Sequence, residues 1–448
     1  MLNVDAFISQ VLACAAREGL EAAEVFYTNS DSFSARCVKG EIASYTVSES
    51  GGLSLRGIWQ GKMGYASTEA LDEDAVSQLI SGVKESAELT EDKDVQEIFR
   101  GSEAYAEVPS YSAALQNVPE SDKLKLILDL EKKTLAADAS IRQTGVNIVA
   151  TDSVQTVLCN SYGLKLTHQA NYAYAGVQAI ASNKGKTASA FELEWGKEFD
   201  ALNADRMAEN AAKRAVWMLD AAPVVSGKYP VVFASDAMCD LLATFSGMFS
   251  AENAQKGLSL LKGKEGQKIA GDCVTLIDDP LLAGGIESCP FDAEGVAAYT
   301  KNVVENGTLT TLLHNLKTAK KAGVQSTGNA SKRSYNSPVT VSHSNFYIKP
   351  GELSLPDLLK EVSDGIVITE VTGLHAGADP ISGDFSLLSE GYTIKNGEKD
   401  LPVNQITVAG NFYELLKNIR LVANDLRFPG SSVGSPSVFA GEMSIAGK

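Results

Sequence analysis

The chain has 448 residues, enough for two or three domains of ordinary size, each with its own core. Apolar residues make up 44% and charged residues 21%, close to globular averages, so we expect the chain to fold throughout. The formal net charge of −17, with no basic stripe to offset it, argues against a protein that binds nucleic acid through its phosphates.

The amino terminus predicts an amphipathic helix over residues 3–18, bracketed by Asp5 and Glu18, rather than a signal peptide. No apolar run elsewhere approaches the roughly 18 residues that a membrane span needs. The six cysteines form no CxxC pair, so neither a disulfide scaffold nor a zinc ribbon is indicated. We therefore expect a cytoplasmic protein with no membrane or nucleic-acid partner.

Strand-like runs followed by a helix occur twice before residue 222. In both halves a Gly-Lys turn leads into a strand, and Asp72 or Asn203 is the expected N-cap of the helix that follows. We interpret residues 1–222 as an N-terminal α+β domain that duplicates a β-meander-plus-helix unit. The strand-like runs of the first half are residues 24–29, 32–38, 52–59 and 62–68.

A linker with two prolines and a glycine, residues 221–230, marks the expected boundary to a second domain. Beyond it the sequence predicts a buried strand, a long helical region from 235 to about 262, and short strands with Asn-Gly hairpin turns at 306–307 and 396–397. Residues 223–448 are therefore predicted to be mostly β with a few packed helices, and the fold class is α+β.

The first part of that helical region has one continuous apolar face and begins at Ser235, a candidate N-cap. Methionines at such a spacing are more often core than functional, so we expect this helix to be buried. The apolar face consists of Met238, Leu241, Leu242, Phe245, Met248 and Phe249.

A glycine-rich segment, GLHAGADPISGDFSLLSEGY, places His375, Asp379 and Asp384 in what we predict to be one loop over residues 373–390. A histidine with one or two carboxylates can bind a metal or transfer protons. The same aspartates could instead bond the backbone of turns set by the glycines and Pro380. The interpretation we favour is the wall of a cleft that binds a peptide or a partner, with the chemistry elsewhere.

Other chemistry has little support in the sequence. The remaining histidines, His168, His314 and His343, are far apart and are expected on the surface or in loops, without a metal. GxSxG, GxGxxG and P-loop patterns are absent, so neither a serine hydrolase nor a nucleotide cofactor is indicated.

Residues 228–448 contain a series of distinctive segments: CPFDAEGVAAYTKNVVENGTL, STGNA, SDGIVITEVTGL, ISGDFSLLSEGYTIKNGE, LPVNQITVAGNFYELLKNI, VANDLRF and GSPSV. In order and spacing they closely resemble the PmbA/TldE branch of the TldD/PmbA family of bacterial peptidases. The older family label, modulator of DNA gyrase, names a phenotype rather than a chemistry.

In the TldD branch, the resemblance implies a zinc peptidase with a HExxxH motif and a Cys ligand near the carboxy terminus, where the metal activates water and the Glu acts as base. At the matching positions this chain has Ala243, Thr244 and Met248, and the segment PGSSVGSPS offers serines in place of the Cys. The resemblance therefore implies a chain that holds no metal, no cofactor and no catalytic group of its own.

By the same resemblance, the chain is a TldE-type subunit that pairs with a zinc-bearing TldD-type subunit. The pair is expected to cut unfolded peptides, including precursors of small modified peptides and labile antitoxins, and the isolated chain could form homodimers. Two alternatives stay open. The chain could be a self-standing enzyme, with a metal near His375, Asp379 and Asp384 or with a reactive thiol, or a non-enzymatic module that acts on gyrase or DNA, which its acidity disfavours.

Overall fold

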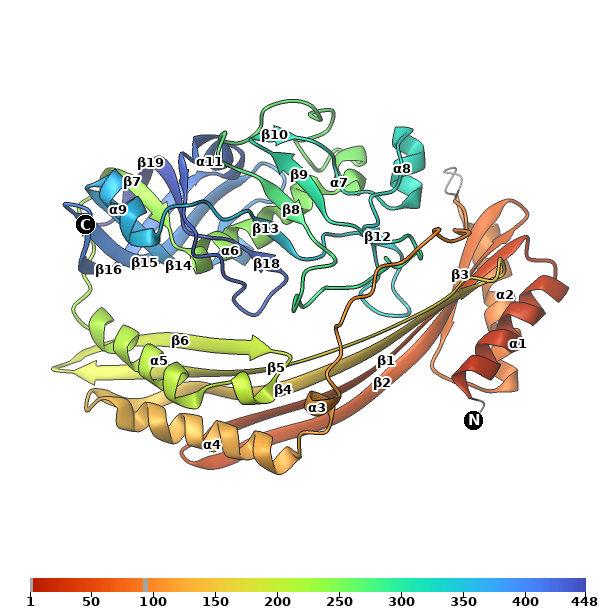
Figure 1. Ribbon diagram of the computed structural model, residues 1–448, viewed down its shortest axis with the longest axis horizontal. Coiled ribbons are helices and arrows are strands. Elements are labelled where there is room, and N and C mark those ends of the chain that lie inside the picture. Colours follow the sequence, from red (N-terminus) through yellow and green to blue (C-terminus); the bar gives the residue numbers. More distant parts are fainter. Residues whose placement is uncertain (1–2, 92–95) are drawn as a thin grey trace.

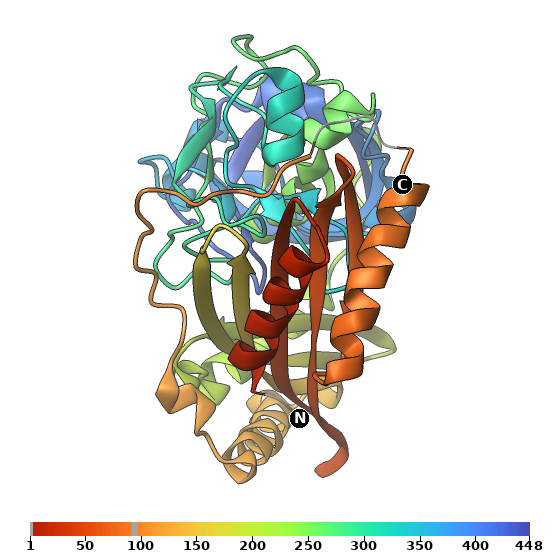
Figure 2. The same cartoon turned by 90° about the vertical axis from the view of Figure 1, so that its right-hand side faces the viewer.

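The computed structural model describes residues 3–91 and 96–448 (Figure 1). The N-terminal part is one long curved sheet with helices on its outer face, and the C-terminal part lies over the inner face of that sheet (Figures 1 and 2). No helix of the described chain is both long and apolar enough to cross a membrane.

Six long strands form the N-terminal sheet in the order β3-β2-β1-β4-β5-β6, so two meanders join edge to edge through β1 and β4. The runs expected as separate strands at 24–29 and 32–38 form a single strand. The elements are α1 (Val4–Arg17), β1 (Ala22–Val38), β2 (Glu41–Trp59), β3 (Lys62–Thr68), α2 (Glu73–Leu89), α3 (Ala113–Gln116), α4 (Glu120–Ala137), β4 (Ile141–Asn160), β5 (Lys165–Asn183), β6 (Lys186–Gly196), η1 (Phe199–Ala201) and α5 (Ala204–Met218).

Alternation along the strands decides which face each helix covers. On β1, Val25 and Phe33 lie in the two apolar clusters that the sheet forms with its helices, whereas Phe26 packs with Phe291 of the C-terminal part. Helices α1 and α2 cover one meander, and α4 and α5 cover the other. The expected N-caps are confirmed, because the side chains of Asp72 and Asn203 each accept a backbone N–H bond from the first turn of their helix.

Two large sheets and one central helix build the core of the C-terminal part, and β11 and β12 form a separate two-stranded sheet. The six-stranded sheet has the order β16-β15-β14-β7-β19-β17, and the five-stranded sheet the order β10-β9-β8-β13-β18. The elements are β7 (Gly227–Phe233), α6 (Ser235–Phe245), η2 (Ser246–Phe249), α7 (Ala251–Gln255), β8 (Leu276–Asp278), β9 (Lys301–Glu305), β10 (Thr308–Leu309), α8 (Leu316–Ala322), β11 (Ala330–Ser331), β12 (Thr340–Val341), β13 (Phe346–Ile348), α9 (Leu355–Val362), β14 (Gly365–Thr372), α10 (Leu374–Gly377), β15 (Asp384–Lys395), β16 (Glu398–Asn411), α11 (Phe412–Asn418), β17 (Leu421–Val422), β18 (Val433–Gly434) and β19 (Val438–Ala446).

Both predicted Asn-Gly hairpin turns are confirmed, with positive φ at each residue: 46° and 81° at Asn306 and Gly307, and 52° and 79° at Asn396 and Gly397. The boundary at residue 222 lies in the connection between α5 and β7, and the division into two domains stays a prediction.

Three further local predictions were wrong. The helical region from 235 to about 262 is broken into α6, η2 and α7, because the Ser250 side chain caps a new helix after the turn at Gly247. The N-cap of α6 is Ala234, not Ser235, and it makes no side-chain bond. The long loop at 373–390 is the short helix α10, a turn, and then β15 from Asp384 onward.

Candidate functional site

Helix α6 and the 3₁₀ turn η2 pack their predicted apolar face into the core between the two C-terminal sheets. All six residues of that face are at most 2% exposed. Phe245 stacks on Phe412 with ring centroids 4.6 Å apart, and α6 contacts β14 of one sheet and β18 of the other. The prediction of a buried helix is confirmed, and this packing fixes which side chains α6 leaves for the surface.

The three residues at the positions of the family metal motif do not fit a zinc site. Ala243 is exposed and has no donor atom. The Thr244 hydroxyl donates to the carbonyl of Asp240 at 2.7 Å, one helical turn back. Met248 is 2% exposed and lies in the core. These positions therefore supply neither an imidazole nor a carboxylate, which zinc in peptidases requires.

Two serines of the segment PGSSVGSPS, which stands in place of the family Cys, also have structural roles. Ser435 and Ser437 are fully buried. The Ser437 hydroxyl donates to Asp425 at 2.7 Å, and its backbone N–H donates to the other carboxylate oxygen at 2.8 Å. This bonding fixes the approach to β19 and leaves no free hydroxyl at Ser437.

A cleft of about 470 Å³ opens beside the first turn of α6, between that helix, β14, β15 and helix α5 of the N-terminal part. The Asp236 carboxylate on α6 lies 3.5 Å from the Arg427 guanidinium. Also lining the cleft, the Lys399 ammonium lies 3.5 Å from the centre of the Trp217 ring. The cleft thus has charged and aromatic walls from both parts of the molecule.

Carboxyl groups in and near this cleft share an acidic environment: Asp236, Glu370 and Glu390 line it, whereas Asp240 lies one turn further along α6, outside the lining and exposed. Desolvation, followed by the charges of Asp236 and Glu370, raises the pKa of Asp240 to about 6. Desolvation and the charge of Glu370 also raise the pKa of Glu390, against a smaller opposing effect of Arg214. Such groups can accept hydrogen bonds from a peptide backbone or a cationic side chain. The sequence carried one missed signal for them: two aspartates at an i, i+4 spacing on an otherwise apolar helix.

The three polar residues singled out in residues 373–392 are only partly brought together. Asp379 accepts the backbone N–H groups of Ile381 and Ser382 at 2.8 and 3.2 Å, which lowers its pKa. Asp384 accepts the Ser382 hydroxyl at 3.1 Å and the Asn411 amide at 2.8 Å. His375 is exposed on α10, and no hydrogen bond joins it to either aspartate. The aspartates hold a turn, and their role in a cleft stays a prediction.

The other histidines are not all as predicted. His314 lies in a loop, as predicted, although it is only 4% exposed. His168 is half-buried within β5, so the expectation of a surface or loop position was wrong for His168. Within residues 3–91 and 96–448, no group of three or more His, Cys, Asp or Glu side chains is arranged to hold a metal.

Three cysteine thiols, those of Cys37, Cys239 and Cys289, have raised pKa values. Burial raises the pKa of Cys239, with Asp236 and Asp240 adding to the effect, and burial raises the pKa values of Cys37 and Cys289 to about 12. Because the thiolate is the reactive form, these shifts disfavour a nucleophile at any of these three residues.

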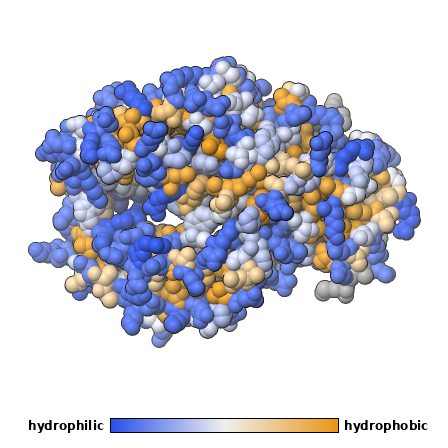
Figure 3. All heavy atoms as spheres, viewed as in Figure 1, coloured by the Kyte–Doolittle hydropathy of each residue, from blue (hydrophilic) through white to orange (hydrophobic). Residues whose placement is uncertain are grey.

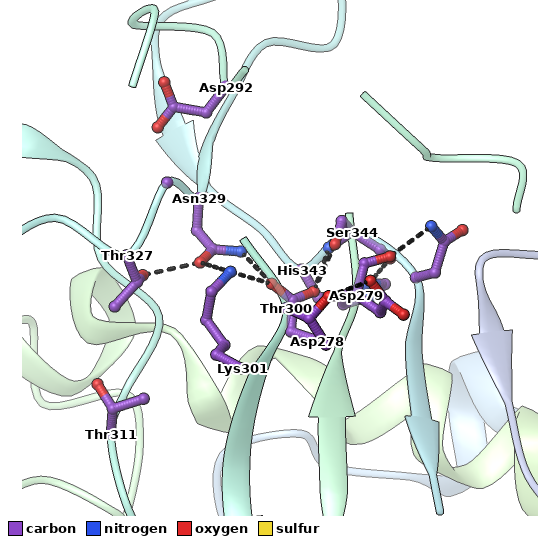
Figure 4. Close-up of polar contacts among 12 residues, drawn as sticks. Asp278, Asp279, Asp292, Thr300, Lys301, Thr311, Thr327, Asn329, His343 and Ser344 are labelled. Carbon is purple, nitrogen blue, oxygen red and sulfur yellow. Dashed lines mark hydrogen bonds and ion pairs between the residues drawn. The ribbon is translucent and has the colours of Figure 1, made fainter. Parts of the chain in front are cut away.

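A second polar centre lies deeper in the C-terminal part, around Asp278 (Figure 4). The Lys301 ammonium donates to Asp278 at 2.9 Å, and the Asn329 amide donates to the same oxygen at 2.8 Å. The backbone N–H and hydroxyl of Ser344 donate to the other oxygen at 2.6 and 2.8 Å. Burial acts to raise the pKa of Asp278, but Lys301 and these hydrogen bonds outweigh it and lower the pKa. This network, which we name the Asp278 cluster (Asp278, Lys301, Asn329 and Ser344), ties the STGNA segment to two strands.

A further cavity, of about 520 Å³, lies between the inner face of the N-terminal sheet and the C-terminal segments 286–289 and 332–335. Figure 3 shows the molecule hollowed between its two parts. The candidate site is therefore the space between the parts, with the cleft at α6 on one side and this cavity on the other.

Family models match nearly the whole chain. The PmbA/TldA metallopeptidase C-terminal domain matches residues 226–447, the central domain matches residues 113–219, and domain 1 matches residues 23–87. The N-terminal sheet, which we interpreted as one duplicated domain, thus corresponds to two family domains joined through β1 and β4.

Relatives and solved structures agree with these matches. An uncharacterized protein of Methanocaldococcus jannaschii is 31% identical over 97% of this chain and 99% of its own length. The metalloprotease PmbA of Escherichia coli O157:H7 is 26% identical over 96% of this chain and 93% of its own. A crystal structure from Thermotoga maritima, named as a candidate modulator of a DNA gyrase, has a TM-score of 0.93 at 32% identity and covers 99% of this chain and 100% of that one.

TldE of Thermococcus kodakarensis shares the fold, with a TM-score of 0.89 at 21% identity over 98% of this chain and 100% of that one. Together with the segments from CPFD to GSPSV and the sheet architecture, these likenesses lead to one conclusion: this chain belongs to the PmbA/TldD family of metallopeptidases.

Proposed function

We propose that this chain is the TldE-type subunit of a zinc-dependent TldD/TldE-type peptidase of the cytoplasm that cuts unfolded peptides, and that it contributes no metal ligand. The observation that carries the proposal is Met248. A side chain that is 2% exposed and packed in the core stands where the metal motif needs a histidine facing the site. Membership of a peptidase family supports the reaction class, and the shared fold with a protein named TldE supports the subunit type.

The space between the two parts suits this role. A peptide held in an enclosed cleft is bound mostly through backbone hydrogen bonds and pockets for side chains, so a subunit without the metal can still set affinity. The carboxyl groups and the Trp217 wall beside α6 supply such contacts. The zinc, and the water that it activates, would come from the partner subunit.

Reconstitution with a family homologue that carries HExxxH tests the proposal. Cleavage of a labelled unfolded peptide is expected from the mixture and from neither chain alone, with zinc recovered in proportion to the homologue. Size-exclusion chromatography with light scattering should show a mixed oligomer, and would also show whether the isolated chain is a homodimer. One tightly bound zinc per isolated chain, lost on His375→Ala together with peptidase activity, would contradict the proposal and favour the self-standing enzyme.

A further inference from the structure

The cavity between segments 286–289 and 332–335 and the inner face of the sheet has an unusual set of charges. Lys332 and Arg333 both line it, and neither side chain forms an ion pair with any described residue. Glu287 is the one carboxylate among the described lining residues. Lys332 is half-buried and Arg333 is exposed, so two cations face a single lining carboxylate, and this local excess of positive charge favours binding of an anion.

Lys332 is well placed for such a role. Its ammonium donates to the Ser54 hydroxyl at 2.6 Å and lies 4.8 Å from the centre of the Phe26 ring, both on the inner face of the sheet. Burial, followed by the charge of Arg56, lowers the pKa of Lys332 to about 8, against an opposing effect of Glu24. An anion next to this ammonium would favour its charged form and restore the lost solvation.

The segment that carries both cations is anchored on the sheet by Tyr335. The Tyr335 ring lies directly over Gly52 of β2, where a Cβ would meet the ring at 2.5 Å. The Tyr335 hydroxyl donates to Glu69 at the end of β3. Because the segment is anchored at Tyr335 and at Lys332, little ordering entropy is lost when a ligand binds.

Hydroxyl groups form the floor of the cavity. Ser30 of β1 lies 2.9 Å from Ser50 of β2 through their side-chain oxygens, and Thr28 and Thr156 line the same floor. On β5, the Nε2 atom of His168 is buried without a partner among the described residues. These groups can donate hydrogen bonds to carboxylate oxygens or exchange them with a peptide backbone. A volume of about 520 Å³ lies in the range of sites for small ligands.

We propose that this cavity binds the carboxylate group of a peptide, with Lys332 and Arg333 as its cationic contacts and the hydroxyl floor of the sheet beneath it. The inference rests on the proposed function for its choice of a peptide as the ligand. A carboxylate can come from the C-terminus of the peptide or from an acidic side chain, and the chemistry of recognition is the same for both.

The net charge of −17 makes a preference for anionic peptides informative. The general field of the protein repels anions, so a preference for the more negative of two matched peptides has to arise locally. Charge-assisted hydrogen bonds are the strong ones, and we expect the free acid to bind at least roughly tenfold more tightly than its amide.

The test measures fluorescence anisotropy of an N-terminally labelled, uncharged octapeptide on the full chain without any partner. Three forms are compared: free C-terminus, C-terminal amide, and amide with one internal Glu. Tighter binding of the free acid alone supports recognition of a C-terminus. Equal gains from the free acid and the internal Glu support recognition of carboxylates from either source. Equal affinities for all three forms overturn the inference.

Variants locate the site. Arg333→Gln is expected to remove most of the preference for the free acid, since Arg333 is exposed and its loss should not disturb folding. Lys332→Met should have the same effect, with a single cooperative urea transition as the check on its fold. The matched control is Arg142→Gln, which removes the same charge. Arg142 is an exposed residue of β4 and does not line the cavity. Equal losses in Arg142→Gln and Arg333→Gln would also overturn the inference.

These measurements separate the two proposals. If the chain prefers carboxylates but gives no cleavage with a HExxxH homologue, the proposed function is contradicted and the inference of a carboxylate-binding cavity stands. If the reconstituted pair cleaves the peptide but the isolated chain binds the free acid and the amide equally, the carboxylate-binding inference is contradicted and the proposed function stands.

Discussion

The Asp278 cluster and the ionic cluster around Arg56 bury charged side chains in the same chain, but they differ in how completely the charges are matched. In the first cluster, every polar side-chain atom has a partner. In the second, Arg56 pairs with Glu24 at 2.7 Å and with Glu294 at 2.9 Å, yet one oxygen of Glu24 and one nitrogen of Arg56 are buried without partners among the described residues.

The two clusters also differ in location. The Asp278 cluster lies within the C-terminal part, whereas the Arg56 cluster joins β1 and β2 of the N-terminal sheet to Glu294 of the C-terminal part. A fully satisfied network fixes one arrangement of the chain, because each broken bond leaves a costly buried group. The unmatched atoms of Glu24 and Arg56 are buried, and neither residue lines the cavity at Lys332. We therefore assign the first cluster to the fold, and we infer that the second holds the two parts of the molecule together less completely.

The largest expected effect comes from breaking the complete cluster. Lys301→Met leaves Asp278 buried without its cation, and we expect a loss of about 3–5 kcal/mol in the free energy of unfolding. Urea unfolding followed by circular dichroism measures it. Lys349→Met, an exposed lysine, is the control and should change stability by less than about 0.5 kcal/mol. A Lys301→Met protein as stable as this control would mean that the cluster does not hold the fold.

An apolar change gives the scale against which that loss is judged. Phe245→Ala removes a ring that stacks on Phe412 and should cost about 3–5 kcal/mol through lost burial and a residual cavity. Thr244→Ala, its neighbour on the half-buried side of α6, loses only a bond to the Asp240 carbonyl and should cost about 1 kcal/mol or less. If Thr244→Ala instead abolished activity of the assembled peptidase at unchanged stability, α6 would have a functional role of its own.

The carboxyl cluster at α6 provides a third case, in which like charges lie together. The folded state raises the pKa of Asp240 from 3.8 to about 6, so folding favours its protonated form. The contribution of Asp240 to stability is therefore complete below about pH 4 and is lost as the pH rises through 6. Asp240→Asn should be more stable than the wild type at pH 7, and the difference should shrink toward pH 4.

Urea midpoints measured between pH 4 and pH 8 check this expectation. The control is Glu361→Gln, which alters an exposed carboxylate on α9 and should leave the pH profile unchanged. A profile for Asp240→Asn that runs parallel to the wild type over the whole range would show that the carboxyl is not perturbed.

How well the sequence predicted each feature depends on how far apart in the sequence the residues that form it lie. The caps at Asp72 and Asn203, the Asn-Gly turns and the apolar face of α6 depend on neighbours within a few residues, and all were predicted. The break after Phe245 was missed because the apolar spacing continues through it, while Ser250 and the turn at Gly247 end the helix.

The site was predicted less well because its residues meet only through long-range pairing. Strands β1 and β4 pair residues more than a hundred positions apart, such as Val25 with Cys159, and no local pattern reports that pairing. The cavity at Lys332 depends on it, since the floor comes from β1, β2, β4 and β5 and the cations come from a C-terminal segment. The sequence drew attention instead to His375, Asp379 and Asp384, which are close in sequence and hold a turn.

The smallest expected effect on stability belongs to the lysine without an ion pair. Lys332→Met removes a desolvated cation whose one hydrogen-bond acceptor among the described residues is Ser54, so we expect a change of about 1 kcal/mol or less, or a gain. Its pKa is lowered to about 8 in the folded state, below the ordinary 10.5, so the wild type should gain stability as the pH rises from about 8 toward 10. The Met variant should lack that gain. Urea midpoints at pH 7 and pH 10 measure both quantities, with Lys349→Met as the control. A loss as large as that of Lys301→Met would show that Lys332 stabilises the fold as strongly as the paired lysine does.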